Sequence, residues 1–403
     1  MDPGPVHPWY PGTASARVAA GRHAAQPPSM GRRRALAAMA AASSMPALGA
    51  ASASGDDDGF EAVFPRTLLF PRDHGAHPGH RIEWWYLTAV LGRRDGVAVA
   101  PIGLQLTFFR IRTALGSENR STFAARQLLM AHVAIADPSR GGLLHEERVE
   151  RDGYGTGFAT DDMRIAVDRW RFERHPVDGR FLAACDGRLL RIALRATPRQ
   201  PLLLQGDRGF SQKADTRQGG GASYYYSVPQ LACEASIDTR GASTGNPVSA
   251  TWTGTGWLDH EWSSALLPAS AAGWDWLGAN LDDGSALTAF RLRDRSGATL
   301  STYASLRRAD ADGSVATLAG DAVRFETLRT WTSPRTRATY PVAQRLHIAD
   351  RMFETVPLMP DQELDSRLDT GVVYWEGASR IREAGRDAGV GYLELTGYAP
   401  PSR

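Results

Sequence analysis

The sequence has few cysteines, and this excludes one common architecture of exported proteins. Cys185 and Cys233 are its only cysteines, too few for a scaffold held together by disulfides. They are also not arranged as a Cys-x-x-Cys metal or redox pair. The two thiols could form one bridge in an oxidising compartment or stay as separate buried groups, since sequence spacing does not place their Cα atoms within bonding reach.

Long hydrophobic runs and clustered positive charge are also missing. No stretch reaches the ~18 apolar residues that a membrane span needs, so no transmembrane segment is predicted. The net charge is +2, and residues 1–53 alone carry five arginines against one aspartate. Lys213 is the only lysine, and the arginines are scattered along the chain. Nucleic acid is therefore not a predicted partner.

The sequence shows no signature of common cofactor or hydrolase chemistry. It has no His-Glu-x-x-His zinc helix, P-loop or dinucleotide fingerprint. Helical periodicity is scarce, so no strand-to-helix turn is predicted that could carry a Gly-x-Ser-x-Gly nucleophile elbow. No cofactor is predicted.

The start of the chain is predicted to be a targeting segment. Residues 1–29 are rich in Pro, Ala and Gly, and they read as disordered or as an extension upstream of a true start at Met30. Arg32-Arg33-Arg34 precedes a mild apolar run, and Ala51-Ser52-Ala53 suits signal peptidase. Residues 30–53 are thus predicted to be a cleaved signal peptide of the twin-arginine type; a Sec signal or an Ala-rich linker are the alternatives. The protein would then use the export machinery and be periplasmic or secreted.

The remaining chain reads as all-β. Short segments rich in β-branched and aromatic residues are separated by turn signals such as Arg94-Asp95-Gly96, Asp282-Asp283-Gly284 and Asp312-Gly313. This spacing predicts an antiparallel barrel or sandwich. The predicted strands are Arg81–Leu91, Val97–Arg112, Gln127–Ala136, Leu189–Ala196, Ala250–Trp262, Gly273–Leu281, Ala286–Asp294 and Gly391–Tyr398.

A polar, Gly-rich stretch divides this β region into two comparable halves. Thr239–Pro247 is the best linker candidate, whereas Gly219-Gly220-Gly221 reads as a loop within the first half. We therefore predict an N-terminal domain over residues 58–246 and a C-terminal domain over residues 247–403.

Two aromatic motifs carry ionisable groups: Glu83-Trp84-Trp85-Tyr86 and Gly256-Trp257-Leu258-Asp259-His260-Glu261-Trp262. Alternation along a strand puts His260 and Trp262 on one face, with Asp259 and Glu261 on the other. One interpretation is acid–base chemistry or ligand recognition in an apolar pocket. The other is a Trp-rich core in which His260 is satisfied by a backbone partner.

Asp259, His260 and Glu261 also resemble part of a metal site. Adjacent strand residues point to opposite faces, however, so the three could bind one ion only at a bulge. His132 would have to supply a second imidazole from another strand. No metal is predicted.

At these motifs the chain resembles the carotenoid 1,2-hydratase (hydroxyneurosporene synthase) family and its exported AttH-like relatives. The resemblance runs from about Phe60 to Tyr398 and implies two tandem lipocalin-like antiparallel β-barrels or half-barrels. The matching motifs are Glu83-Trp84-Trp85-Tyr86, Gly103–Arg110, Ala131–Asp137, Tyr224-Tyr225-Tyr226-Ser227, Trp257–Trp262, Gly273-Trp274-Asp275-Trp276, Tyr374-Trp375-Glu376-Gly377 and Gly391–Gly397.

The resemblance implies a type of chemistry. The hydratase branch adds water across an isolated double bond at a terpenoid chain end, without a redox cofactor. Such a step needs a proton donor, for which a carboxyl in an apolar pocket is suited, and indole faces that stabilise a cation. The family's His-x-Trp pattern falls on His260 and Trp262. A Tyr and an Asp expected in the strand after Trp-Asp-Trp are missing from Ala286–Arg291.

Further candidates come from the residues themselves. Glu83 is expensive to bury without a donor, and Arg110 is its predicted partner in a structural ion pair, with a role as catalytic acid left open. His132 is either a satisfied core residue or part of the site. The predicted catalytic set is His260, Asp259, Glu261 and Asp275. The predicted substrate-binding set is Trp262, Trp276, Trp84, Tyr86, Gln105, Tyr224, Tyr226 and His132.

The leading hypothesis is an exported protein that binds a lipophilic small molecule, such as a terpenoid, polyene or lipid, at the interface between the two halves. If it is an enzyme, hydration or related lyase chemistry centred on His260 is expected. A carrier without activity, a secreted hydrolase, or a second half with only a structural role are the alternatives.

Overall fold

The computed structural model describes residues 59–94, 99–113, 121, 124–213, 221–240, 250–265, 267–309, 314–367 and 372–399. The predicted leader and signal peptide lie outside these residues, as do most of the predicted linker Thr239–Pro247, two glycines of the Gly219–Gly221 loop, and the turns at 95–96 and 312–313.

The first half of the chain forms one antiparallel sheet of 13 strands within the described residues. Its spatial order is β4-β3-β2-β1-β13-β12-β9-β8-β7-β6-β5, with β10 and β11 also paired to β12. The strands are β1 (Ile82–Arg93), β2 (Ile102–Arg112), β3 (Gln127–Asp137), β4 (Gly142–Arg151), β5 (Gly157–Phe158), β6 (Arg164–Val167), β7 (Trp170–Arg174), β8 (Phe181–Asp186), β9 (Leu190–Thr197), β10 (Leu203–Leu204), β11 (Phe210–Gln212), β12 (Ala222–Thr239) and β13 (Ala250–Ser263).

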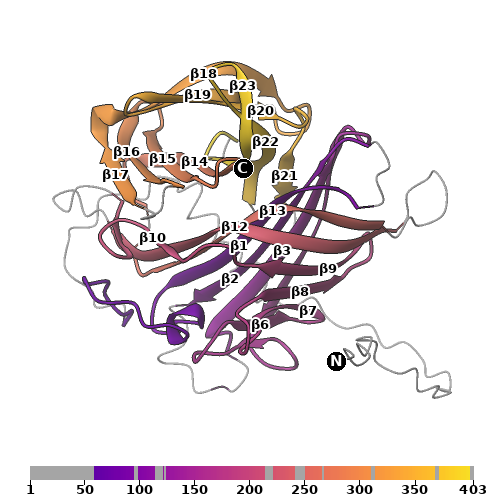
Figure 1. Ribbon diagram of the computed structural model, residues 1–403. Coiled ribbons are helices and arrows are strands. Elements are labelled where there is room, and N and C mark those ends of the chain that lie inside the picture. The colour runs from indigo at the N-terminus through magenta and orange to yellow at the C-terminus, as the bar shows by residue number, and fades with distance from the viewer. Residues whose placement is uncertain are drawn as a thin grey trace, which may run out of the picture.

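The second half forms a sheet of 10 strands among the residues described, in the order β17-β16-β15-β14-β23-β22-β20-β19-β18, with β21 paired to β22. Coloured orange to yellow in Figure 1, it curls round above the first sheet. Its strands are β14 (Ala271–Leu281), β15 (Ala286–Asp294), β16 (Thr299–Arg307), β17 (Val315–Ala319), β18 (Val323–Thr332), β19 (Thr339–Ile348), β20 (Arg351–Pro357), β21 (Glu363–Ser366), β22 (Val372–Glu383) and β23 (Arg386–Thr396).

The prediction of an all-β fold with two antiparallel, barrel-like halves is confirmed. The eight predicted strands all fall on observed strands, and the predicted turn at Asp282–Gly284 joins β14 to β15. Gly284 has φ of +87°, a conformation that glycine adopts without steric cost. The only helices in the described residues are the 3-10 turns η1 (Arg72–His74) and η4 (Gly320–Ala322). Neither has the length and hydrophobicity that crossing a bilayer requires.

The chain changes sheet between Ser263 and Ala271. The boundary predicted at 246/247 lies before this point, and β13, which follows that boundary, pairs with β1 and β12 of the first sheet. The division into two domains stays a prediction.

Cys185 and Cys233 are both buried and are not bridged. They lie on β8 and β12, and β9 runs between these strands. Strands two positions apart are separated by about 9.6 Å, twice the interstrand spacing, which is beyond the reach of a disulfide.

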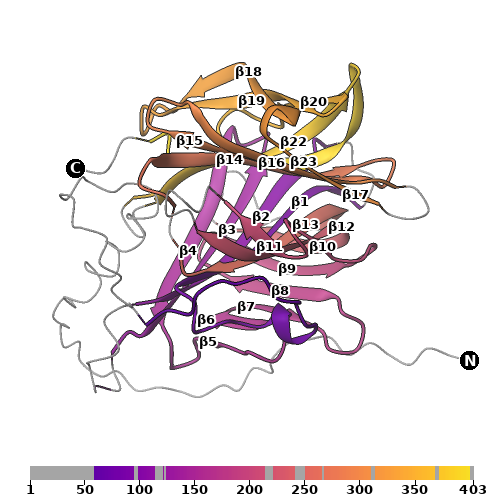
Figure 2. The ribbon, with the colours of Figure 1, turned by 90° about the vertical axis from the view of Figure 1, so that its left-hand side faces the viewer.

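The central strands of the first sheet are buried on both faces. On β1, Trp85 and Leu87 pack in the interior of the first sheet, whereas Tyr86 and Val90 pack against the second sheet. The burial pattern of β9 instead alternates between buried and exposed. In both views the second sheet covers one face of these long strands (Figures 1 and 2). Each central strand therefore presents one set of side chains to each of two different environments.

Candidate functional site

A cavity of about 300 Å³ lies between the two sheets, at the lower end of the range for small-molecule sites. Nine of its lining residues are aromatic and come from both halves of the chain: Trp84, Tyr86, Phe109 and Tyr225 from the first, Trp274, Trp276, Phe290, Tyr303 and Tyr374 from the second. The predicted location of a site, at the interface between the halves, thus coincides with an aromatic cavity. Whether it binds a ligand stays a prediction.

Asp259 of β13 faces this cavity. Its carboxyl accepts hydrogen bonds from the Tyr225 hydroxyl at 2.7 Å, the Ser227 hydroxyl at 2.5 Å and the Trp257 indole N–H at 2.7 Å. Trp276 in turn donates to the Tyr225 hydroxyl at 3.0 Å. Burial raises the pKa of Asp259 to about 7 even though its three neutral donors lower it. The group can therefore gain or lose a proton near neutral pH.

Two glutamates of the second sheet also face the cavity. Glu376 of β22 and Glu394 of β23 are directly opposite each other in the strand pairing. Tyr86, which reaches across from the first sheet, donates a short hydrogen bond to Glu376. Burial and the neighbouring Glu394 raise the pKa of Glu376 well above its ordinary value. Burial, with repulsion from Asp259 and Glu261, raises the pKa of Glu394 to about 8.

An ion pair lies at another part of the cavity wall. Lys213 Nζ is 2.7 Å from Glu261 Oε1, and it also lies over the rings of Tyr225 and Phe290. Glu261 thus has a cationic partner, unlike Asp259 on the same face of β13.

His132 lines the cavity from β3, where its Nδ1 is 2.7 Å from the Tyr374 hydroxyl. Burial lowers the pKa of His132 to about 3, so the imidazole is neutral at physiological pH. Gln105 is buried beside it on β2 and donates a short hydrogen bond to Thr107, a residue of the cavity wall.

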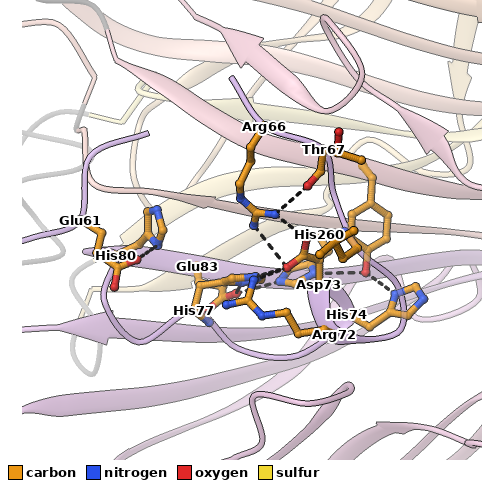
Figure 3. Close-up of polar contacts among 12 residues, drawn as sticks. Glu61, Arg66, Thr67, Arg72, Asp73, His74, His77, His80, Glu83 and His260 are labelled. Atoms are coloured by element: carbon orange, nitrogen blue, oxygen red, sulfur yellow. Dashed lines mark hydrogen bonds and ion pairs between the residues drawn. The ribbon is translucent and has the colours of Figure 1, made fainter. Parts of the chain in front are cut away.

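The opposite face of β13 carries a different polar cluster, inside the first sheet (Figure 3). Glu83 is fully buried, and Arg110 Nε donates to its Oε2 at 2.8 Å. Its Oε1 lies 2.7 Å from His77 Nδ1 and 2.9 Å from His260 Nε2. Burial would raise the pKa of Glu83, but the charge of His77, the hydrogen bonds from both histidines and the Arg110 charge together hold it well below its ordinary value. The residue predicted to pair with Glu83 is therefore present, together with two histidines.

The cluster extends through His77 to a second carboxylate. His77 Nε2 lies 3.1 Å from Asp73 Oδ1, and Asp73 is paired with Arg66 and Arg72, each at 2.6 Å. Since both ring nitrogens of His77 face carboxylates, the two acids raise its pKa although burial opposes this. Figure 3 shows Arg66 and Arg72 beside Asp73, and His77 close to Glu83.

His260 is completely buried in this cluster and does not line the cavity. Its ring stacks on Trp85 at 4.6 Å between centroids, and its Nδ1 lies 3.1 Å from the Tyr226 hydroxyl. Burial lowers the pKa of His260 to about 4. Trp262 stacks on His77 at 3.8 Å and 3°, so it too lies away from the cavity.

His77, Glu83 and His260 place one possible ligand atom each within 4.8 Å of one another. A metal there would have to displace the N–H groups that both histidines direct at Glu83 Oε1. Arg110 holds the other oxygen of the same carboxylate. The donor set therefore fits a hydrogen-bonded charge cluster better than a metal centre. A regular β1–β13 pairing from Ile82 to Arg93 keeps Asp259 and Glu261 on the face opposite His260, as alternation predicts.

The other predicted site residues divide between the two environments. Asp275 lies in the second sheet, paired with Arg291 and Arg293, and is not part of the cavity wall. Tyr224 and Tyr226 pack in the interior of the first sheet, whereas Tyr225 between them faces the cavity. Trp84, Tyr86, Trp276, Asp259, Glu261 and His132 all line the cavity.

Sequence reasoning missed Tyr225, Glu376 and Glu394 as site residues. Each lies inside an aromatic motif, Tyr224–Ser227, Tyr374–Gly377 or Gly391–Gly397. For Glu376 and Glu394, the available signal was a carboxylate within an otherwise apolar strand. What the sequence did not reveal is which strand face would meet the second sheet.

The fold and cavity define a lipocalin-like β-protein of two sheets, with an aromatic cavity between them. The chain belongs to the AttH-like family, whose model matches residues 61–398. A solved AttH structure from Nitrosomonas europaea is 43% identical with a TM-score of 0.75, and the match covers 84% of this chain and 100% of that one.

Two more distant structures share the fold. Kievitone hydratase from Nectria haematococca is 14% identical with a TM-score of 0.58, covering 84% of this chain and 98% of that one. CghA with Sch210972 is 14% identical with a TM-score of 0.50, covering 85% and 97%. At this identity the two likenesses are ones of fold alone. No functionally curated protein matches the chain.

Proposed function

We propose that this protein binds an apolar small molecule in the cavity between the sheets and catalyses acid–base chemistry there, of the hydro-lyase type. One observation carries the proposal: three carboxyl groups with raised pKa values, Asp259, Glu376 and Glu394, face one aromatic cavity. Perturbed carboxyls that converge on a pocket are typical of catalytic sites.

The residues that line the cavity suggest how this acid–base chemistry would proceed. A neutral carboxylic acid can protonate an alkene carbon, and the faces of Trp84 and Trp276 can stabilise the resulting carbocation. Water then adds to the cation and gives up a proton to a carboxylate. The reverse sequence removes water from an alcohol. The proposal moves the proton-handling centre from His260 to the cavity carboxyls, because His260 is directed at Glu83 within the first sheet.

The family and the fold are consistent with this proposal, but the proposal does not depend on them. One fold neighbour is named a hydratase, and fold by itself does not determine chemistry. The specific carotenoid 1,2-hydratase activity is one version of the proposal, since the cavity is aromatic enough for an isoprenoid chain end.

We further propose that the protein is exported through the twin-arginine route and acts outside the cytoplasm. The support is the Arg32-Arg33-Arg34 segment followed by a mild apolar run and Ala51-Ser52-Ala53. Fractionation of cells that express the full chain tests this, and a substitution of Arg32-Arg33 by lysines should leave the protein in the cytoplasm. Periplasmic accumulation of that variant would contradict the route.

The function is tested by organic extraction and native mass spectrometry of the full-length protein purified from its own cells, wild type beside Asp259→Asn. A lipophilic molecule that is lighter by one water in the variant supports hydration. The same molecule in both proteins favours a carrier without activity. No bound molecule in either protein, together with no binding of the neutral dye Nile red, would overturn the proposed ligand site.

A further inference from the structure

Glu376 and Glu394 form a pair of carboxyls with an unusual setting. They are cross-strand neighbours of β22 and β23, whose side chains on one face lie about 5 Å apart at Cβ. Glu376 is 3% exposed, and Glu394 keeps part of its surface open to the cavity. In the described part of the chain, no Lys, Arg or His forms an ion pair with either group.

Among the other buried carboxylates, Glu146 accepts three backbone N–H bonds and Glu261 is paired with Lys213. Four others are paired with arginine. Each has an arginine nitrogen within 3.2 Å: Arg66 for Asp73, Arg110 for Glu83, Arg293 for Asp275 and Arg335 for Glu363. A buried carboxylate without a cation costs several kcal/mol, so such a group takes up a proton instead. Two of them side by side cannot both be ionised.

We propose that Glu376 and Glu394 together form the proton-donating centre of the cavity, with Asp259 on the facing sheet as the proton acceptor. This inference rests on the proposed function and assigns the roles within it. Tyr86 is a positioning residue, because its hydroxyl reaches across the sheets and donates to Glu376. The two halves of the chain would each supply one part of the reaction.

Each step balances with water as the only co-reactant. The O–H of Glu394, the more exposed member of the pair, protonates one alkene carbon, and the carboxylate left behind shares the proton of Glu376. Asp259, ionised above a pH of about 7, removes a proton from the water molecule that bonds to the other carbon. Proton transfer from Asp259 back to Glu394 restores the starting state, and the net change is addition of one water.

The groups that face the pair support this direction of proton transfer. Tyr86, Tyr374 and Tyr392 face Glu376 from β1, β22 and β23, and Trp274 donates to Glu394 from β14. Asp259 and Glu261 face Glu394 from β13 and repel its ionised form. None of these neighbours is a cation, so no charge among these described groups stabilises the carboxylates of the pair.

The same wall defines the class of substrate. Among the described residues of the wall, the one cation is Lys213, which Glu261 holds, and burial favours the neutral forms of Glu376, Glu394 and His132 near pH 7. We therefore expect an uncharged, largely hydrocarbon molecule with a double bond, or the corresponding alcohol. Fatty-acid anions or other charged lipids would lack a free cation in this wall.

Infrared spectroscopy tests the shared proton without any substrate. The full-length protein and its Asp259→Asn variant should both show a carbonyl stretch from a protonated carboxyl at pH 7, and part of it should disappear as pH rises through about 8. Absence of this band from Asp259→Asn at pH 7 would overturn the inference, whatever the fate of other variants.

Glu376→Gln and Glu394→Gln assign the band. Each should remove its own part of the band and shift the part that remains, while Glu363→Gln, a buried glutamate of the same sheet that is held by Arg335 and lies outside the cavity wall, should leave it unchanged. A band with unchanged intensity and position in both cavity variants would overturn the assignment.

Failure of this inference and failure of the proposed function give different results. In one outcome, the infrared band behaves as expected while Nile red does not bind and no molecule is extracted. That result would support the protonated carboxyl pair and contradict the proposed ligand site. If Nile red binds but the infrared band is missing, ligand binding in the cavity is supported, and Glu376 and Glu394 are excluded as its proton donor.

Discussion

The two faces of strand β13 put similar residues to different uses. On the inner face, His260 lies against Glu83, a carboxylate that Arg110 neutralises. On the outer face, Asp259 is held by three neutral donors and no cation. The result is a carboxylate with a strongly lowered pKa on one side of the sheet and an acid with a pKa of about 7 on the other.

The presence or absence of a cationic partner distinguishes polar groups that stabilise the fold from those suited to catalysis. Charges that compensate each other inside a sheet hold segments together, as Glu83 does for β1, β2 and the loop at His77. A compensated carboxylate such as Glu83 keeps a pKa well below its ordinary value and is a poor proton carrier at neutral pH. Uncompensated carboxyls beside a cavity keep their protons near neutral pH, which suits proton transfer but lowers stability when they ionise.

The largest expected loss of stability comes from removing the Glu83 carboxylate, whose charge Arg110 compensates. Glu83→Gln leaves Arg110 buried without its partner, and we expect a loss of about 3–5 kcal/mol in the free energy of unfolding. Urea denaturation followed by tryptophan fluorescence measures this. The exposed Glu326→Gln on β18, whose side chain is 48% accessible, serves as control and should change stability by about 0.5 kcal/mol or less. Equal effects of the two changes would contradict a structural role for the Glu83 cluster.

The next largest effect concerns the pH dependence of stability. Because the pKa of Asp259 rises from 3.8 to about 7 on folding, the folded protein retains a proton there that the unfolded chain loses. Stability should therefore fall as pH rises from about 4 to about 7, and Asp259 should contribute about 1.4 kcal/mol per pH unit to that slope. Asp259→Asn should have a shallower slope in denaturation midpoints over this range. Parallel curves for variant and wild type would show that Asp259 is not held protonated.

A smaller change tests the positioning role of Tyr86. Tyr86→Phe removes the hydrogen bond that lowers the pKa of Glu376, so the protonated-carboxyl band should persist to higher pH. The loss of stability should be about 1 kcal/mol. Tyr398→Phe, which removes a similar bond to Asp275, is the matched control and should cost as much without moving the band. A band that titrates identically in Tyr86→Phe would exclude this role.

The smallest expected effect is at the ion pair on the cavity wall. Lys213 is partly exposed, at 21% of its side chain, but Glu261 is buried, so we remove both partners: Lys213→Met combined with Glu261→Gln should change stability by about 1 kcal/mol or less. Binding of Nile red should be nearly unchanged, since the inferred ligand has no charge. An anionic dye that binds the wild type more tightly than Nile red, and is lost in this double variant, would contradict the inferred class of ligand.

Several parts of the fold were predictable because they depend on local pattern. Alternating β-branched and aromatic residues with turn signals located the strands, and β15 was predicted with its observed ends, Ala286 and Asp294. The Glu83–Arg110 contact was also foreseen, since a carboxylate in an apolar strand needs a donor and Arg110 lies near the end of the following strand, directly opposite Glu83. The predicted leader, export route and ligand remain predictions.

Other parts depend on contacts that no local pattern specifies. Tyr86 and Glu376 are 290 residues apart, and His132 meets Tyr374 across 242 residues. Sequence reasoning put Tyr224 and Tyr226 in the pocket, whereas the side chains there face the interior of the first sheet and Tyr225 faces the cavity. The alternation was correct, but which face would be covered by the second sheet was open.

The sequence by itself determined that β13 would separate His260 from Asp259, because successive side chains of a strand point to opposite sides. Only the tertiary structure decided which of the two would meet a cation and which a cavity. A pKa depends on burial and on charges within a few ångströms, and those charges come from strands far away along the chain. The local pattern therefore specified the residues, and packing of the two sheets set their ionisation.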